Sequence, residues 1–162
     1  MAFREDFSTS TSEMTPLRPA TRAEIDTFFG ELKAMKEGLR LDYHDHGCAE
    51  RSNLIQIMLE QRGLIHGTAH CTFDQGNWHQ HHAAFVVCEE DGQRVSYVLD
   101  PAECKTPLTS TAWKELWVQD GADPRSFLFL DGFLGSKNEE ALYRKLHAWG
   151  KSEPFSPALD MA

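Results

Sequence analysis

A cysteine stands where the chain could present a nucleophile. Cys48 lies in D-H-G-C-A-E-R, at the start of A-E-R-S-N-L-I-Q-I-M-L-E-Q-R-G, which has the composition of a helix closed by Gly63. A thiol attacks a carboxamide as its thiolate, and a helix N-terminus favours the thiolate through its N–H groups and dipole. A cysteine in such a place is more often a small buried residue. The prediction of a nucleophile at Cys48 therefore depends on a base and a carboxylate nearby.

Two later residues could supply them, at the ends of a predicted hairpin. His82 opens H-A-A-F-V-V-C-E, Asp100 closes R-V-S-Y-V-L-D, and E-D-G forms the turn between the two strands. A three-residue turn at 90–92 would place His82 opposite Asp100 on one face, whereas a two-residue turn at 91–92 would place them on opposite faces. We expect the three-residue turn, with His82 as the base and Asp100 orienting its ring.

The histidines also allow a metal site. W-H-Q-H-H contains His79, His81 and His82, but neighbouring residues of a strand point to opposite faces, and the chain has no H-E-x-x-H pair. We therefore expect no metal, and we interpret His44, His46 and His79 as loop residues.

The other cysteines and the tryptophans fit structural roles. Cys71 and Cys88 are in phase with the apolar faces of strands and are predicted to be core residues, whereas Cys104 is predicted to be a surface thiol. Helix packing is the interpretation for Trp113, Trp117 and Trp149.

The overall composition limits the class of partner. Among 162 residues, 25 acids against 16 Lys and Arg give a formal charge of −9, which argues against a nucleic-acid groove. The first residues carry no apolar run long enough for a Sec signal or a membrane span, so we expect no membrane partner and cytoplasmic residence. Export by a non-Sec route would leave no mark here.

The order of elements predicts an α+β fold. A capping box at Thr21 starts a helix that ends near Gly38, and the helix after Cys48 is followed by strands near 64–73, 82–89 and 94–100. A short helix near 112–118, a strand at 126–130 and a helix from 138 to about 149 complete the pattern. Two helices before an antiparallel sheet exclude an alternating βαβ fold. We expect a flexible arm at 1–20, one catalytic domain at 21–150 and a flexible tail at 151–162.

Four motifs in this order resemble the bacterial protein-glutamine glutaminases, also called protein deamidases. They are D-H-G-C-A-E-R, H-H-A-A-F-V-V, V-L-D-P and P-L-T-S-T-A-W, and they span about Asp45 to Trp113. The resemblance implies a papain-like or transglutaminase-like fold, in which a nucleophile helix packs on an antiparallel sheet. It also implies the triad Cys48, His82 and Asp100. The known enzymes are secreted with a signal and a pro-region and use disulfides, and this sequence departs from them in these respects.

The expected reaction is deamidation of glutamine side chains in proteins or peptides through a thioester, with no metal or organic cofactor. The backbone N–H of Cys48 would be one oxyanion donor, and a second is expected from the loop that carries His44, Asp45 and His46. Two alternatives remain open, because a triad does not specify its substrate. One is a peptidase, amidase or acyl transferase in peptide or polyketide tailoring, and the other is a non-catalytic interaction protein on the same fold.

Overall fold

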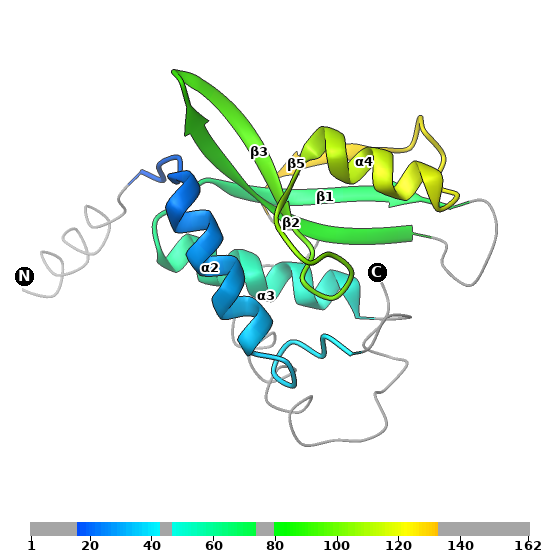
Figure 1. The fold of residues 1–162 in the computed structure, drawn as a ribbon, viewed down its shortest axis with the longest axis horizontal. Helices are drawn as coiled ribbons and strands as arrows, with labels where there is room; N and C mark the ends of the chain where they lie inside the picture. The colour runs from blue at the N-terminus through cyan, green and yellow to red at the C-terminus, as the bar shows by residue number, and fades with distance from the viewer. Residues whose placement is uncertain (1–15, 43–46, 74–79, 133–162) are drawn as a thin grey trace, which may run out of the picture.

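In the residues that the structure describes, the fold joins three helices to one antiparallel sheet (Figure 1). The computed structural model describes residues 16–42, 47–73 and 80–132. Five strands pair in the order β4-β3-β2-β1-β5, with every neighbouring pair antiparallel. The strands are β1 (His66–Thr72), β2 (Gln80–Glu90), β3 (Gln93–Leu99), β4 (Leu108–Thr109) and β5 (Leu128–Asp131). The predicted α+β class is confirmed.

Two of the three described helices begin where the sequence predicts, and the third begins at Ser110, two residues before the predicted Ala112. Helix α2 (Arg22–Ala34) has the predicted capping box, in which Thr21 and Glu24 bond each other's backbone N–H groups. Helix α3 (Cys48–Gln61) begins at Cys48, and α4 (Ser110–Gln119) is capped by the Thr109 hydroxyl. Helix α2 ends four residues before the predicted Gly38, and turns follow it as far as residue 42.

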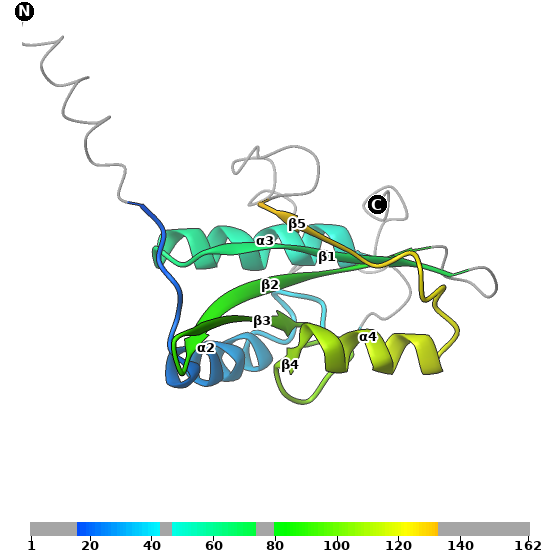
Figure 2. The ribbon, with the colours of Figure 1, turned by 90° about the horizontal axis from the view of Figure 1, so that it is seen from above.

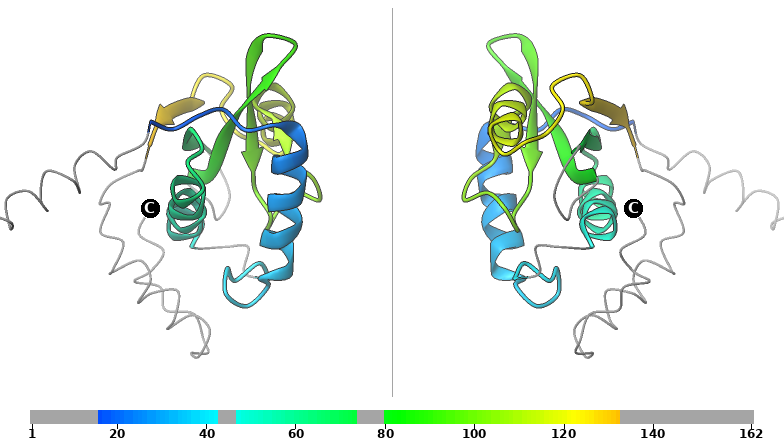
Figure 3. Two further views of the ribbon diagram at one scale, coloured as in Figure 1. Left: turned by 90° about the vertical axis from the view of Figure 1, so that its left-hand side faces the viewer. Right: turned by 90° about the vertical axis from the view of Figure 1, so that its right-hand side faces the viewer.

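The sheet lies between two apolar cores. Figure 2 shows the strands between α3 and α4, and Figure 3 shows the β2–β3 hairpin rising above α2 and α3. Alternate residues of β2 serve the two cores: Ala84 and Val86 pack with α2 and α3, whereas Ala83 and Phe85 pack with the tryptophans of α4. Because both faces of β2 are buried, this strand can direct one side chain into each core.

The β2–β3 turn differs from the prediction. Glu90 pairs with Gln93, and the turn consists of two residues, Asp91 and Gly92, both with positive φ (50° and 78°). Turns of this kind match the right-handed twist of the flanking strands and favour Asp-Gly. The predicted three-residue turn is therefore wrong, and every pairing along the hairpin is shifted by one residue.

Part of the predicted N-terminal arm is hydrogen-bonded to the rest of the domain. The backbone of Arg18 bonds that of Gly63 and Ile65, and the backbone of Ala20 bonds that of Val87 and Glu89. Residues 1–15, the predicted final helix and the predicted tail lie outside the described residues. The domain boundaries and the compartment stay predictions. No helix in the described ranges is both long and apolar enough to span a membrane.

Candidate active site

Cys48 is the first residue of α3, as its sequence position predicts. Gly47 is the N-cap, in a left-handed conformation (φ 83°), and its carbonyl accepts the first helical hydrogen bond from the Arg51 N–H at 2.9 Å. A glycine has no side chain that could cap the helix, so the N–H groups of the first turn of α3 donate no bond to a side chain of the N-cap residue. The half-buried thiol therefore sits at the positive end of the helix dipole.

His81, and not His82, is the partner of Asp100. Nε2 of His81 donates to Oδ2 of Asp100 at 2.9 Å, and both side chains are almost fully buried, at 1% and 2% exposure. Ala84 is paired with Leu99, so the residue before it in β2, Ala83, lies opposite Asp100. His81 is two residues from Ala83 and therefore points to the same face of the sheet. The predicted pairing of His82 with Asp100 is wrong, because the two-residue turn reverses which histidine faces the carboxylate.

The carboxylate of Asp100 is fixed from several directions. Nε1 of Trp113 also donates to Oδ2, at 3.0 Å. The Asp100 carbonyl accepts backbone N–H groups from Glu103 and Cys104, at 3.1 and 2.7 Å, which closes the turn after β3. The acceptor therefore cannot turn away from the His81 ring without breaking a second buried bond. Trp113 was predicted only as a packing residue, so its hydrogen bond was missed.

The site favours an ion pair between thiolate and imidazolium. Burial acts to raise the pKa of the Cys48 thiol, but hydrogen bonds from His81 and then His82 outweigh it and lower the pKa to about 5. For His81, burial acts to lower the pKa, and the charge and hydrogen bond of Asp100 outweigh burial and raise it to about 10. The pKa of Asp100 is lowered, because His81 opposes the cost of burial. At neutral pH, Cys48 is therefore the anion and His81 the cation.

Arg51, the last residue of D-H-G-C-A-E-R, links the helix of Cys48 to the chain that precedes it. Its Nε and Nη2 donate to the carbonyls of Leu39 and Arg40, each at 2.8 Å, and the side chain is buried. Arg40 has a positive φ of 52°, an uncommon conformation that these bonds help to hold. The guanidinium also lies within electrostatic range of Asp100 and Cys48. It therefore adds positive charge near both anions.

His82 contacts the thiol from β2. Its Nδ1 lies 3.7 Å from Sγ of Cys48, and the ring is 2% exposed. The imidazoles of both His81 and His82 therefore interact with the Cys48 thiol, but only His81 is hydrogen-bonded to Asp100.

The remaining cysteines lie in a different environment. Cys71 and Cys88 are fully buried, as predicted, but Cys104 is buried as well, so the prediction of a surface thiol is wrong. Burial raises the pKa of Cys71 and of Cys104 to about 12 and raises that of Cys88 too. Only Cys48, among the four, has a lowered pKa.

Several predicted loop residues cannot be compared with the structure. His44, Asp45, His46 and His79 lie outside the described residues, and so does the predicted second oxyanion donor. In residues 16–42, 47–73 and 80–132, no group of three or more His, Cys, Asp or Glu side chains is arranged to hold a metal ion.

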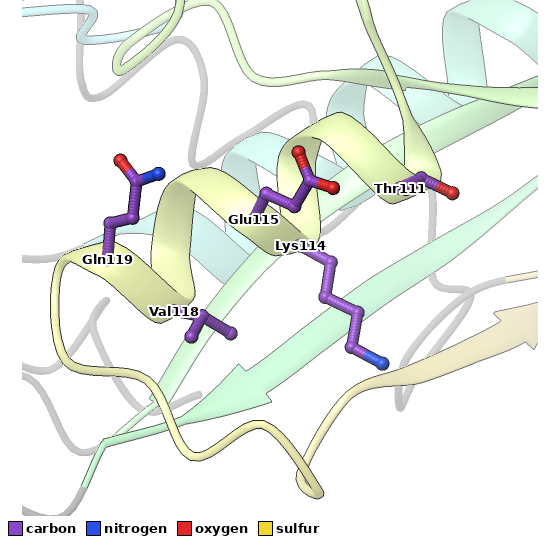
Figure 4. Close-up of a pocket in the computed structure, with 5 residues that line it drawn as sticks. All are labelled: Thr111, Lys114, Glu115, Val118 and Gln119. Atoms are coloured by element: carbon purple, nitrogen blue, oxygen red, sulfur yellow. The ribbon is translucent and has the colours of Figure 1, made fainter.

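A surface hollow along α4 is separate from these residues. Its volume is about 430 Å³, and its lining comes from one helix: Thr111, Lys114, Glu115, Val118 and Gln119 (Figure 4). Trp113 and Trp117 of the same helix are buried instead, Trp113 stacked on the His81 ring and Trp117 tilted against it. The side of α4 that contacts the candidate active site is therefore the buried side, and the hollow lies on another side of the helix.

Comparison with solved structures gives the same fold. The chain matches a crystal structure of pro-protein-glutaminase with a TM-score of 0.69 and 17% identity, over 90% of this chain and 64% of that one. It matches a crystal structure of protein-glutaminase with a TM-score of 0.67 and 17% identity, over 91% and 97% of the two chains. An NMR structure of protein-glutaminase from Chryseobacterium proteolyticum gives 0.62 and 18%, over 85% and 94%. The chain thus spans less than two thirds of the pro-protein and most of the shorter forms.

Comparison by sequence gives the family. No curated protein matches the chain. A family model described as glutaminase matches residues 25–117, more than half of the sequence, and the match includes Cys48, His81 and Asp100. This chain belongs to that glutaminase family.

Proposed function

We propose that this protein is a cysteine amidohydrolase that converts glutamine side chains of proteins or peptides into glutamate and releases ammonia. Cys48 is the nucleophile, His81 the general acid and base, and Asp100 the residue that orients the His81 ring. The observation that carries the proposal is the chain of contacts from a helix-terminal thiol to His81 and on to Asp100, with the lowered pKa of that thiol. Membership of a glutaminase family supports the choice of reaction.

The reaction follows from the protonation states of the resting site. The Cys48 thiolate attacks the side-chain carbonyl carbon of glutamine and forms a tetrahedral oxyanion, which the backbone N–H of Cys48 can bind. His81 gives its proton to the departing nitrogen, so the C–N bond breaks and ammonia leaves a thioester on Cys48. Water then loses a proton to His81 and attacks the thioester. The C–S bond breaks, the thiolate and imidazolium are restored, and the product is glutamate.

Asp100 orients the His81 ring and fixes which of its nitrogens transfers protons. Because Nε2 of His81 is committed to Asp100 at 2.9 Å, Nδ1 is the ring nitrogen left to exchange protons with thiol, ammonia and water. The carboxylate stays ionised throughout, and it stabilises the imidazolium that is present at rest and forms again when His81 takes a proton from water. No group beyond these three side chains and water is required to balance the protons.

The proposed substrate is a glutamine within a peptide. Glutamine has one methylene more than asparagine, so its carbonyl reaches the thiolate while the peptide backbone stays at the mouth of the site. Free glutamine should react poorly, because its charged α-groups would lose water at that mouth. The net charge of −9 favours neutral or basic surroundings of the target glutamine.

Ammonia release from three compounds tests the reaction. We expect rapid release from a blocked glutamine dipeptide, much slower release from its asparagine analogue and little from free glutamine. Intact-mass spectrometry of a protein substrate should show a gain of about one mass unit per site without chain cleavage, since an oxygen replaces an NH group. Peptide cleavage or acyl transfer without ammonia would assign the chain to the alternative hydrolase and transferase class.

Matched variants test the roles of the residues. Cys48→Ala should abolish turnover, and Cys71→Ala, which removes a buried thiol with a raised pKa, should retain it. His81→Gln should be inactive while it keeps the fold. Full activity in His81→Gln would return the role of base to the neighbouring histidine and contradict the geometry given above.

A further inference from the structure

The thiol of Cys48 has a second imidazole partner that the triad does not use. Nδ1 of His82 lies 3.7 Å from Sγ, within hydrogen-bonding range for sulfur. His81, the preceding residue of the same strand, already serves as the link to Asp100. A buried histidine beside the reacting sulfur, on a different face of β2, therefore needs an explanation of its own.

The surroundings of His82 hold its ring in place. The ring of His70, from the paired position of β1, lies against it with centroids 4.6 Å apart and a tilt of 36°. Nε2 of His70 is bonded to Oε1 of Gln80 at 3.1 Å. An amide oxygen only accepts, so this nitrogen of His70 carries the proton. Burial, the largest influence, lowers the pKa of His70, which makes His70 a neutral neighbour.

The charges that face the thiol decide which tautomer of His82 fits. The Cys48 sulfur is anionic at neutral pH, so a contact from Nδ1 is favourable only if Nδ1 carries a proton. The titratable and charged groups around the sulfur come from four segments: His81 and His82 from β2, His70 from β1, Arg51 from α3 and Asp100 after β3. Arg51 and His81 lie near the two anions Cys48 and Asp100, and Glu103 and Asp42 also act on Arg51. A proton on Nδ1 of His82 makes its 3.7 Å contact with the sulfur a hydrogen bond to the anion.

We propose that His82 is a second hydrogen-bond donor to the Cys48 thiolate, which holds the sulfur through the steps in which His81 transfers its proton. The inference rests on the proposed function only in taking Cys48 as the nucleophile.

The role differs from that of the base. His81 must release its proton to ammonia and take one from water, so its hydrogen bond to the sulfur is interrupted in each half-reaction. His82 transfers no proton. Its N–H remains available to the sulfur when the thioester breaks and the thiolate reappears as a leaving group, which a donor at the sulfur stabilises.

Two variants of nearly the same shape isolate the donor. His82→Asn keeps an N–H at a position close to Nδ1, and His82→Leu replaces the amide by methyl groups on a similar branched skeleton. The readout is the pH midpoint of iodoacetamide alkylation at Cys48, located by peptide mass spectrometry. The midpoint is preferred to a single rate, because a thiolate of higher pKa is also the stronger nucleophile.

We expect the midpoint in His82→Leu to rise by about one pH unit, since hydrogen bonds to charged groups are among the stronger ones. His82→Asn should stay close to the native midpoint. The proposal is wrong if His82→Leu keeps the native midpoint, or if both variants rise equally, because the effect would then be one of packing.

A measurement on the native protein covers the case in which a variant fails to fold. Nitrogen NMR of histidine-labelled protein should show His82 protonated at Nδ1 near pH 7, and a bare Nδ1 would overturn the proposal. Neither measurement needs a glutamine substrate. A protein that showed this donor but released no ammonia would reject the proposed function and leave the inference standing.

Discussion

Replacing Asp100 with asparagine separates the charge of the site from its geometry. His81 and Trp113 both donate to the same oxygen, Oδ2, at 2.9 and 3.0 Å. An asparagine can place its amide oxygen at that point and accept both bonds. Asp100→Asn should therefore keep the His81 ring where it is while it removes the buried negative charge.

The loss of that charge should reverse the protonation of the pair. The charge and hydrogen bond of Asp100 are what raise the pKa of His81 to about 10 against the effect of burial. Without the charge, burial favours neutral imidazole, and the Cys48 thiolate loses its cationic partner. The pKa of Cys48 should then return from about 5 towards the ordinary value of 9.0. At pH 7 this change takes the thiolate from about 99% of molecules to about 1%.

Two measurements follow from this change. The pH midpoint of alkylation at Cys48 should move by more than two units, from about 5 to above pH 7. Turnover on the glutamine dipeptide should fall by about 10⁴-fold, the loss seen when the carboxylate of a serine-protease triad becomes an amide.

Two controls define the interpretation. Trp113→Phe removes one donor to Asp100 but keeps the carboxylate, so its midpoint should remain near that of the native protein. Asp26→Asn removes an exposed acid that pairs with Arg22 on α2 and should change neither measurement. If folded Asp100→Asn kept its alkylation midpoint within one unit of the native value, the proposed cause of the lowered pKa would be refuted.

Three further predictions concern pH and stability. The pKa of Cys48 is depressed in the folded protein, so the stability that its thiolate contributes is present above the ordinary pKa of a thiol and is lost as pH falls through about 5. The pKa of His81 is raised, so the stability that its imidazolium contributes is present below the ordinary pKa of histidine and is lost as pH rises through about 10. Activity should therefore follow a bell between these limits, and a profile with a single rise near pH 9 would contradict the ion pair. Arg51→Met should lower the free energy of unfolding by about 3 kcal/mol in urea titrations, because two carbonyls before Cys48 lose a charged donor, and a change below about 1 kcal/mol would show that the bonds contribute little. Gly92→Ala should cost about 1 to 2 kcal/mol by the same method, because φ is 78° there, and an unchanged stability would mean that the turn relaxes freely.

The sequence predicts most of the local structure. The capping box at Thr21, the helix that starts at Cys48 and the helix after Thr109 all depend on residues within a few positions of each other. Periodicity likewise predicts the strands and their buried positions, including Cys71 and Cys88. These features are decided by local patterns, so one chain is sufficient to predict them.

Register could not be predicted with the same security. Two turn lengths are compatible with E-D-G, and they differ by one residue in every pairing. Burial did not discriminate between them, because apolar residues occupy both faces of β2. The signal that could have decided it is Asp91-Gly92, since a two-residue turn of this composition is the strongest short hairpin signal.

Contacts between distant segments were also missed. The bond from Trp113 to Asp100, the two from Arg51 to the chain before Cys48, and the ring of His70 against His82 each join separate elements. Such contacts depend on how the elements pack. A single sequence carries little information on that packing.

The two-residue turn also has a consequence for folding fidelity. The turn lies at the far end of the β2–β3 hairpin (Figure 1), whereas His81 is the second residue of β2. Because both faces of β2 are buried, a hairpin that closed one residue out of step would still bury apolar side chains, so burial alone rejects the error weakly. Asp91 tolerates positive φ and Gly92 adopts it readily, so the two-residue turn is then the main local feature that selects the native register. A misaligned hairpin would bring His82 to Asp100, so an error at the turn would exchange the two imidazoles.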